Sequence, residues 1–180
     1  MYDDVYSVHA RILHWLTVVL LLGLMTVGLL LGTFRGELGN QLYFYHKSFG
    51  MLLFLVVLWR LGRRIVAGVP EPSPHLTTFQ RNASELVHSW LYGLMLLMPI
   101  AGYVLVAAFP APLDFFGLTA PNVIQPDRAL SGFAADVHFT IAVALGFLIA
   151  VHVSAALYHH FVRKDDVLSR MIPSLKRKRR

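Results

Sequence analysis

The stretch VHFTIAVALGFLIAVHVSAAL at residues 137–157 decides the fold of this chain. It is apolar apart from Thr140, Ser154 and two histidines, His138 and His152. A helix rises about 1.5 Å per residue, so a run of this length spans about 30 Å, the thickness of the hydrocarbon core of a bilayer. We therefore predict a transmembrane helix over residues 136–162 that carries two imidazole groups inside the membrane.

Three further apolar stretches of similar length precede this one, at residues 12–33, 43–63 and 86–108. The first is not followed by a small-residue cleavage site, so we expect a retained helix rather than a signal peptide. Of the 180 residues, 56% are hydrophobic and only 14% are charged, unlike soluble proteins. The sequence therefore predicts an all-α fold, an integral membrane four-helix bundle in the lipid bilayer, with a single domain over residues 1–180.

Lysine and arginine gather on one side of the predicted bundle, and cationic flanks of this kind stay in the cytoplasm. On this side are Arg11, Arg60, Arg63, Arg64, Arg81, Arg163, Lys164, Arg170 and the KRKRR end at 176–180. The opposite side has only Arg35, Lys47 and Arg128. We therefore predict that the N and C termini are both cytoplasmic. The net charge of +6 is then a topology signal, and we expect no nucleic-acid partner.

Four of the nine histidines form a pattern in depth. His138 and His152 are fourteen residues apart on one predicted helix. This spacing places them about 21 Å apart along the axis and within about 40° of the same face. His14 and His46 each lie just inside the start of a predicted helix, on opposite sides of the membrane, so their depths should also differ by roughly 20 Å. The matching depths predict two level pairs, His14 with His152 on the cytoplasmic side and His46 with His138 on the outer side.

Each pair can ligate one heme iron from both faces, and two axial imidazoles favour electron transfer over oxygen binding. The chain has no cysteine, which excludes iron–sulfur clusters, thiolate zinc sites and covalent attachment of heme. We therefore predict two heme b groups, with the four paired histidines as the metal ligands and cofactor-binding residues. Small residues between the two ligand positions of the last helix leave room for a porphyrin: Ala142, Ala144, Gly146 and Ala150.

Two other interpretations of these histidines stay open at this point. They can be structural residues that hydrogen-bond to serine or to the backbone, since buried polar groups need partners. They can also form the relay of a metal or proton transporter inside the membrane. The transporter interpretation predicts a protein without a heme absorption band.

Several motifs resemble the bacterial cytochrome b561 family of compact four-helix diheme membrane proteins, and the likeness covers nearly the whole chain. They are LHWL at 13–16, HKSFG at 46–50, LVHSWLY at 86–92, FGLTAP at 116–121, VH at 137–138 and LYHHFVRKDDVLSRMIP at 157–173. The resemblance implies that the heme ligands are His14, His46, His138 and His152. It also implies a multi-pass protein of the bacterial inner membrane.

One compact member type of that family is a superoxide oxidase, which takes electrons from superoxide at the outer face and passes them to ubiquinone. By this resemblance we expect an enzyme, a superoxide:quinone oxidoreductase, with ubiquinone as the electron acceptor. Larger relatives are cytochrome subunits that collect electrons from hydrogenases or dehydrogenases. The alternative is therefore an electron-transfer subunit and membrane anchor for a periplasmic electron donor.

Three further residues are candidate catalytic residues for the two ends of this reaction. Superoxide is an anion, and the cation Lys47 follows His46 on the outer side. Quinone reduction needs protons, which His88 and His159 can supply on the cytoplasmic side. Both also fit an interfacial belt of basic and aromatic residues, and that interpretation stays open. As a rival heme ligand His159 fits poorly, because it would lie about 32 Å along the axis from His138, beyond the depth of His14.

Overall fold

The structure is a computed structural model that describes residues 5–110, 114–119 and 122–175. Four long helices make up most of it: α1 (Val8–Leu30), α2 (Gly36–Ala67), α3 (Thr78–Ala107) and α4 (Arg128–Tyr158). Two short antiparallel strands, β1 (Asp114–Phe115) and β2 (Leu118–Thr119), lie between α3 and α4 in the chain. Three single turns follow α4: η1 (His159–Arg163), η2 (Leu168–Arg170) and η3 (Pro173–Leu175). The predicted all-α, four-helix fold is confirmed.

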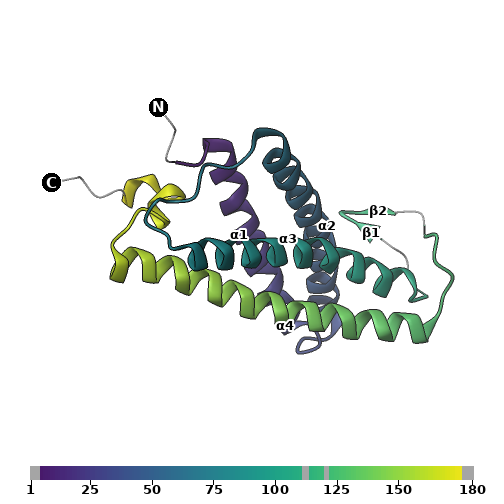
Figure 1. The fold of residues 1–180 in the computed structure, drawn as a ribbon. Helices are drawn as coiled ribbons and strands as arrows, with labels where there is room; N and C mark the ends of the chain where they lie inside the picture. The colour runs from purple at the N-terminus through teal and green to yellow at the C-terminus, as the bar shows by residue number, and fades with distance from the viewer. Residues whose placement is uncertain (1–4, 111–113, 120–121, 176–180) are drawn as a thin grey trace.

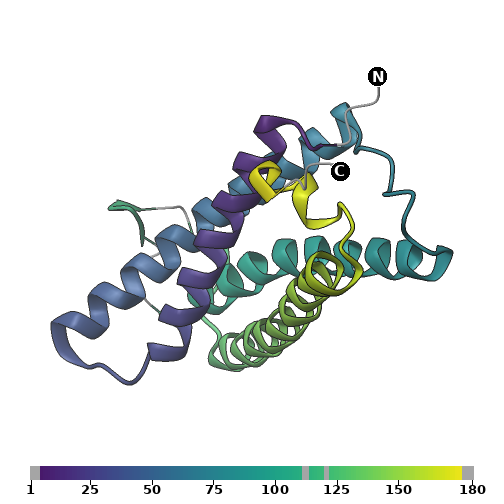
Figure 2. The ribbon, with the colours of Figure 1, turned by 90° about the vertical axis from the view of Figure 1, so that its left-hand side faces the viewer.

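The helices form two antiparallel hairpins, α1 with α2 and α3 with α4, and the hairpins cross at a steep angle (Figure 1). The view from the side shows the same crossing (Figure 2). All four helices contribute to one buried apolar cluster where the hairpins meet, which includes Leu21, Leu53, Val57, Met95, Ile141 and Leu145. The start of the described chain lies near its C-terminal turns, and the backbone N–H of Tyr6 donates to the carbonyl of Arg170 over 3.3 Å.

Three of the helices in the described residues are long and apolar enough to cross a membrane: Val8–Leu30, Thr78–Ala107 and Arg128–Arg163. Large apolar side chains project outward from them, for example Val19, which is 67% exposed, and Phe147, which is 68% exposed. Such exposure suits a lipid-facing surface and not a water-facing one. The crossing by α2, the cytoplasmic termini and the single domain stay predictions, and the KRKRR end lies outside the described residues.

All four helices begin before their predicted spans. Helix α1 begins at Val8 and not at residue 12, α2 at Gly36 and not at 43, α3 at Thr78 and not at 86, and α4 at Arg128 and not at 136. Polar caps explain three of these starts. At the start of α1 the side chain of Ser7 accepts from the N–H of Ala10. The side chain of Thr77 accepts from the N–H of Gln80 in a capping box, and that of Asp127 accepts from two N–H groups at the start of α4. The predicted spans followed the thickness of the hydrocarbon core, whereas a capped helix continues outside it.

Two tight turns position the connections on the outer side. Gly32 and Gly36 have φ values of +89° and +67°, which allow a short link between α1 and α2. The turn between β1 and β2 contains Phe116 and Gly117, both with positive φ. The N–H of Phe116 donates to the fully buried hydroxyl of Ser48 over 2.9 Å. This bond fixes the β-hairpin against α2, close in sequence to the outer histidine of that helix.

Candidate heme-binding sites

The structure brings together the two pairs of histidines that the depth argument matched. At the end of the bundle predicted to be cytoplasmic, His14 of α1 faces His152 of α4, with ring centres 6.4 Å apart and ring planes inclined by 67°. At the other end, predicted to be the outer one, His46 of α2 faces His138 of α4, with ring centres 6.2 Å apart and planes inclined by 71°. The two pairs are called the cytoplasmic and the outer pair by this prediction. Each pair therefore joins the first hairpin to the last helix.

The separation of the rings is that expected for two imidazoles on one metal. Two metal–nitrogen bonds of about 2.0 Å, each followed by about 1.1 Å from nitrogen to ring centre, place the centres about 6.2 Å apart. Within the described residues there is no cluster of three or more histidine, aspartate or glutamate side chains able to hold a metal alone. A metal at either pair therefore needs equatorial ligands of its own, which is what a porphyrin supplies.

A glycine of the neighbouring helix contacts each outer histidine. A Cβ atom at Gly28 of α1 would lie 3.2 Å from Cε1 of His46, and one at Gly102 of α3 would lie 3.1 Å from Cε1 of His138. Both distances are too short for a relaxed contact. The two glycines therefore leave the space that the histidine rings occupy. A larger residue at position 28 or 102 would fill that space. Neither glycine was identified from the sequence, because no motif marks which glycine of an apolar helix faces a ring.

Because Gly102 has no side chain, the His138 ring can approach the backbone of α3 and reach a carbonyl group there. Its Nδ1 donates to the carbonyl of Met98, one turn earlier on α3, over 3.1 Å. With the proton on Nδ1, the lone pair of the neutral ring is on Nε2, the atom left to bind a metal. This hydrogen bond fixes the orientation of the His138 ring.

An arginine, and not a carbonyl, contacts the cytoplasmic pair. Nη2 of Arg60 lies 3.0 Å from Nδ1 of His14, and a guanidinium group can only donate, so Nδ1 accepts and the proton of the neutral ring is on Nε2. For Nε2 of His14 to bind a metal, the proton has to be on Nδ1 and the guanidinium has to move away from it. The same guanidinium lies 5.2 Å from the ring centre of Tyr92, and that of Arg64 lies 5.8 Å from it. Tyr92 therefore holds two cations of α2 against α3, beside the cytoplasmic pair.

The predicted proton donor His88 lies next to the cytoplasmic pair. Its ring centre is 5.1 Å from that of His152, which is about 1 Å less than two imidazoles on one metal require. Its Nδ1 donates to the carbonyl of Ser84 over 2.6 Å. The spacing therefore favours His14, and not His88, as the residue that shares a metal with His152.

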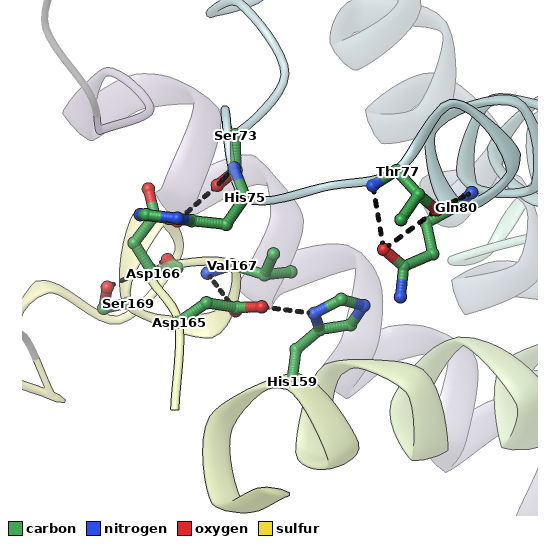
Figure 3. Close-up of polar contacts among 9 residues, drawn as sticks. All are labelled: Ser73, His75, Thr77, Gln80, His159, Asp165, Asp166, Val167 and Ser169. Atoms are coloured by element: carbon green, nitrogen blue, oxygen red, sulfur yellow. Dashed lines mark hydrogen bonds and ion pairs between the residues drawn. The ribbon is translucent and has the colours of Figure 1, made fainter. Parts of the chain in front are cut away.

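His159 is not part of either pair. It is buried, and its Nδ1 lies 2.6 Å from Oδ2 of Asp165 in the segment that follows α4 (Figure 3). The next residue, Asp166, accepts a hydrogen bond from the hydroxyl of Ser73 in the connection between α2 and α3. Two adjacent carboxylates thus hold the chain after α4 to α4 itself and to this connection.

A cavity of about 470 Å³ opens at the outer end of the bundle, and the predicted catalytic residue Lys47 lines it. Other lining residues are Tyr43, Val106, Phe109, Ser131 and Gly132. Nζ of Lys47 lies 5.1 Å from the ring centre of Tyr43. Ser131 is two turns before His138 on α4, so the cavity lies outside the outer pair.

Apolar helices that present facing histidines at the spacing of a bis-imidazole iron define a membrane cytochrome of the b type. The comparison of sequences agrees: the chain matches the family model of prokaryotic cytochrome b561 over residues 5–174, and it belongs to that family. Members of the family bind b-type heme and transfer electrons in the membrane.

Three relatives are similar along nearly their whole length. Cytochrome b561 homolog 2 of Escherichia coli (strain K12) is 32% identical, over 93% of this chain and 90% of the relative. Cytochrome b561 homolog 1 of the same organism is 29% identical, over 91% and 94%. The protein named Probable superoxide oxidase CybB of Yersinia pestis is 27% identical, over 89% and 92%.

Proposed function

We propose that this chain holds two heme b groups and transfers electrons from superoxide at the periplasmic face to ubiquinone. The axial ligands are His14 with His152 and His46 with His138. The observation that carries the proposal is the ring separation of 6.4 Å in one pair and 6.2 Å in the other, against about 6.2 Å for two imidazoles on one iron. Heme bound at each pair supplies an iron that takes up and gives up one electron.

The overall reaction balances with two superoxide ions for each quinone. Each superoxide gives up one electron and leaves as dioxygen, and the quinone takes up two electrons and two protons to become a quinol. The chain therefore has to attract an anion at one face and supply protons at the other. Its candidate residues for these tasks lie at opposite ends of the bundle.

Lys47 is the residue proposed to attract superoxide. It lines the outer cavity and follows directly after the heme ligand His46. Arg35 and Arg128 stand at the starts of α2 and α4, at the same end of the bundle, and add positive potential there. One relative of this length carries the name Probable superoxide oxidase, which supports superoxide as the donor.

His88 and His159 are the residues proposed to supply protons to the quinone. In both rings Nδ1 donates to an oxygen of the chain, the Ser84 carbonyl in one and the Asp165 carboxylate in the other. The nitrogen left to donate to a quinone oxygen is Nε2 in each ring, when it carries a proton. Asp165 also balances the positive charge that His159 then bears.

The test of the heme sites is a reduced-minus-oxidised spectrum with heme quantification on the purified protein. We expect two hemes per chain. His14→Ala and His46→Ala should each remove one heme and leave the other, whereas His75→Ala, in an exposed connection, should keep both. A colourless protein under ample heme supply, or a single-alanine variant with both hemes intact, refutes the ligand assignment.

The test of the donor is rapid mixing with superoxide in the presence of a quinone. Lys47→Ala should slow reduction by superoxide more than reduction by dithionite. The matched control Arg81→Ala removes an exposed cation at the cytoplasmic end and should slow neither. Equal slowing by both reductants counts against Lys47. If the isolated protein holds two hemes but does not oxidise superoxide, the chain is instead an electron-transfer subunit for a periplasmic donor.

A further inference from the structure

A groove of about 580 Å³ lies at the end of the bundle predicted to be cytoplasmic, apart from both histidine pairs. One wall is a face of α1, and the other is formed by the turns after α4, at Met171, Ile172 and Pro173. The hydrogen bond from the N–H of Tyr6 to the carbonyl of Arg170 holds these turns beside the start of α1 (Figure 2). The groove therefore lies where the start of the described chain meets its last turns.

The α1 wall of the groove is apolar and has a cation at one end. Its apolar residues are spaced as one face of a helix and are all exposed: Ile12, Trp15, Leu16 and Val19. Val19 lies about 12 Å further along the axis than Arg11, toward the middle of the bilayer. Arg11 also lines the groove, and its Nε is buried without a hydrogen-bond partner among the described residues. Because a buried N–H without an acceptor is costly, the groove favours a ligand that supplies an oxygen atom to Arg11.

The lining groups indicate the chemistry of this ligand. Of the lining residues, only Arg11 and Trp15 have side-chain N–H donors, and none is acidic. Neither donor can give up its proton in a protein, so the groove cannot supply the protons that quinone reduction needs. A permanent guanidinium cation instead suits a phosphate group, which it binds by charge-assisted hydrogen bonds. The exposed apolar face suits a hydrocarbon chain.

The sequence adds positive charge next to the groove. The run KRKRR at 176–180 begins three residues after Pro173. The nearby carboxylates are those of residues 3–4 and of Asp165 and Asp166, and the last two already contact other side chains. Basic segments beside a membrane attract anionic lipids over a short range. The charge around the groove therefore favours an anionic ligand from the membrane.

We propose that this groove binds an anionic phospholipid. The phosphate accepts hydrogen bonds from the guanidinium of Arg11, and an acyl chain lies along Ile12, Leu16 and Val19. The lipid contacts both walls, so it joins α1 to the turns after α4 and stabilises this end of the bundle. The inference goes beyond the electron transfer proposed above and does not depend on it.

The first arm of the test measures the melting temperature of the purified heme-loaded protein in a neutral detergent. Phosphatidylglycerol should raise it in a dose-dependent way, whereas phosphatidylcholine and inorganic phosphate should not. Equal shifts with the two lipids, or the same shift with inorganic phosphate alone, overturn the proposal. A shift with ubiquinone that is lost in Arg11→Gln, without any effect of phosphatidylglycerol, would assign the groove to a quinone and also overturn it.

The second arm separates a bound headgroup from the general attraction of a cationic surface. Arg11→Gln should raise the apparent Kd for phosphatidylglycerol, measured by lipid titration in native mass spectrometry, by about tenfold or more. The matched control Arg63→Gln removes an exposed cation of α2 that does not line the groove and should change the Kd little. Equal weakening in the two variants overturns the role of Arg11.

The third arm fills the groove and leaves Arg11 in place. Leu16→Trp should weaken the binding of phosphatidylglycerol because the larger side chain takes the space of the acyl chain. Leu29→Trp, exposed on the same helix outside the groove, should not weaken it. An unchanged Kd in Leu16→Trp overturns the proposed position of the lipid. If Arg11→Gln does not fold, this comparison and the lipid preference of the wild type decide the proposal.

Discussion

The substitution Gly102→Ala adds a single methyl group next to His138, a proposed ligand of the outer heme. The new Cβ would lie 3.1 Å from Cε1 of His138 and 3.2 Å from its Nδ1. An unstrained contact needs about 3.5 Å or more between such atoms, so the ring has to move by a few tenths of an ångström. The movement takes Nδ1 away from the Met98 carbonyl, which it now meets at 3.1 Å.

The expected loss follows from three contributions. Overpacking costs about 1–3 kcal/mol, and the weakened hydrogen bond costs about 1 kcal/mol. Alanine in place of glycine inside a helix returns about 0.5–1 kcal/mol. The net cost of about 1–3 kcal/mol corresponds to a loss of heme affinity of about 5- to 150-fold. Loss of a residue that orients a metal-binding histidine has effects of the same size, about 10- to 100-fold.

The matched control is Gly93→Ala on the same helix, where an added Cβ meets no atom within 4 Å. It gains the helix propensity without the clash, so its heme content should equal that of the wild type. The assay is the ratio of heme to protein, measured by pyridine hemochromogen, in protein produced at limiting heme supply. Gly102→Ala should lose outer heme and keep cytoplasmic heme. Equal heme content in the two variants would refute the steric argument.

Three further results are expected. Gly28→Ala should lower the outer heme content in the same assay because its Cβ would lie 3.2 Å from the other outer ligand, whereas Gly23→Ala, on the same helix and in open space, should not. Asp165→Asn should slow quinone reduction with both heme spectra intact, and the neighbouring Asp166→Asn should slow it less; equal rates in both variants count against a role for the carboxylate that contacts His159. Ser48→Ala leaves the N–H of Phe116 without its partner and should lower the free energy of unfolding by about 1–2 kcal/mol in thermal denaturation, and an unchanged melting temperature would contradict this.

The fold and the pairing of the histidines were accessible from the sequence because both follow from regular helix geometry. Each residue of an α-helix adds a fixed rise and a fixed rotation. The fourteen residues between His138 and His152 therefore place them at two depths in the membrane, on the same face of the helix. A neutral imidazole is an axial ligand for heme iron, so two facing imidazoles predict a heme between them. The ends of the helices were less accessible, because Thr77 and Asp127 extend α3 and α4 by caps that lie outside the apolar runs.

The contacts of the histidine side chains were not predictable from the sequence. Arg60 fits both an interfacial anchor and a ligand contact, and only the packing of α2 between α1 and α3 places its guanidinium on His14. The bond from His138 to the Met98 carbonyl depends on the local approach of α4 to α3, which no periodicity encodes. Likewise the carboxylate partner of His159 comes from a turn after α4, whose course is set by tertiary contacts.

Helix α4 contributes one member to each histidine pair, and of the four long helices it leaves the ribosome last. Neither pair exists in a nascent chain that has inserted only its first three helices. With the proposed ligands, heme can bind only after α4 has joined the bundle, and it cannot guide the insertion of the first three helices. A chain that stalls before α4 would then hold no heme.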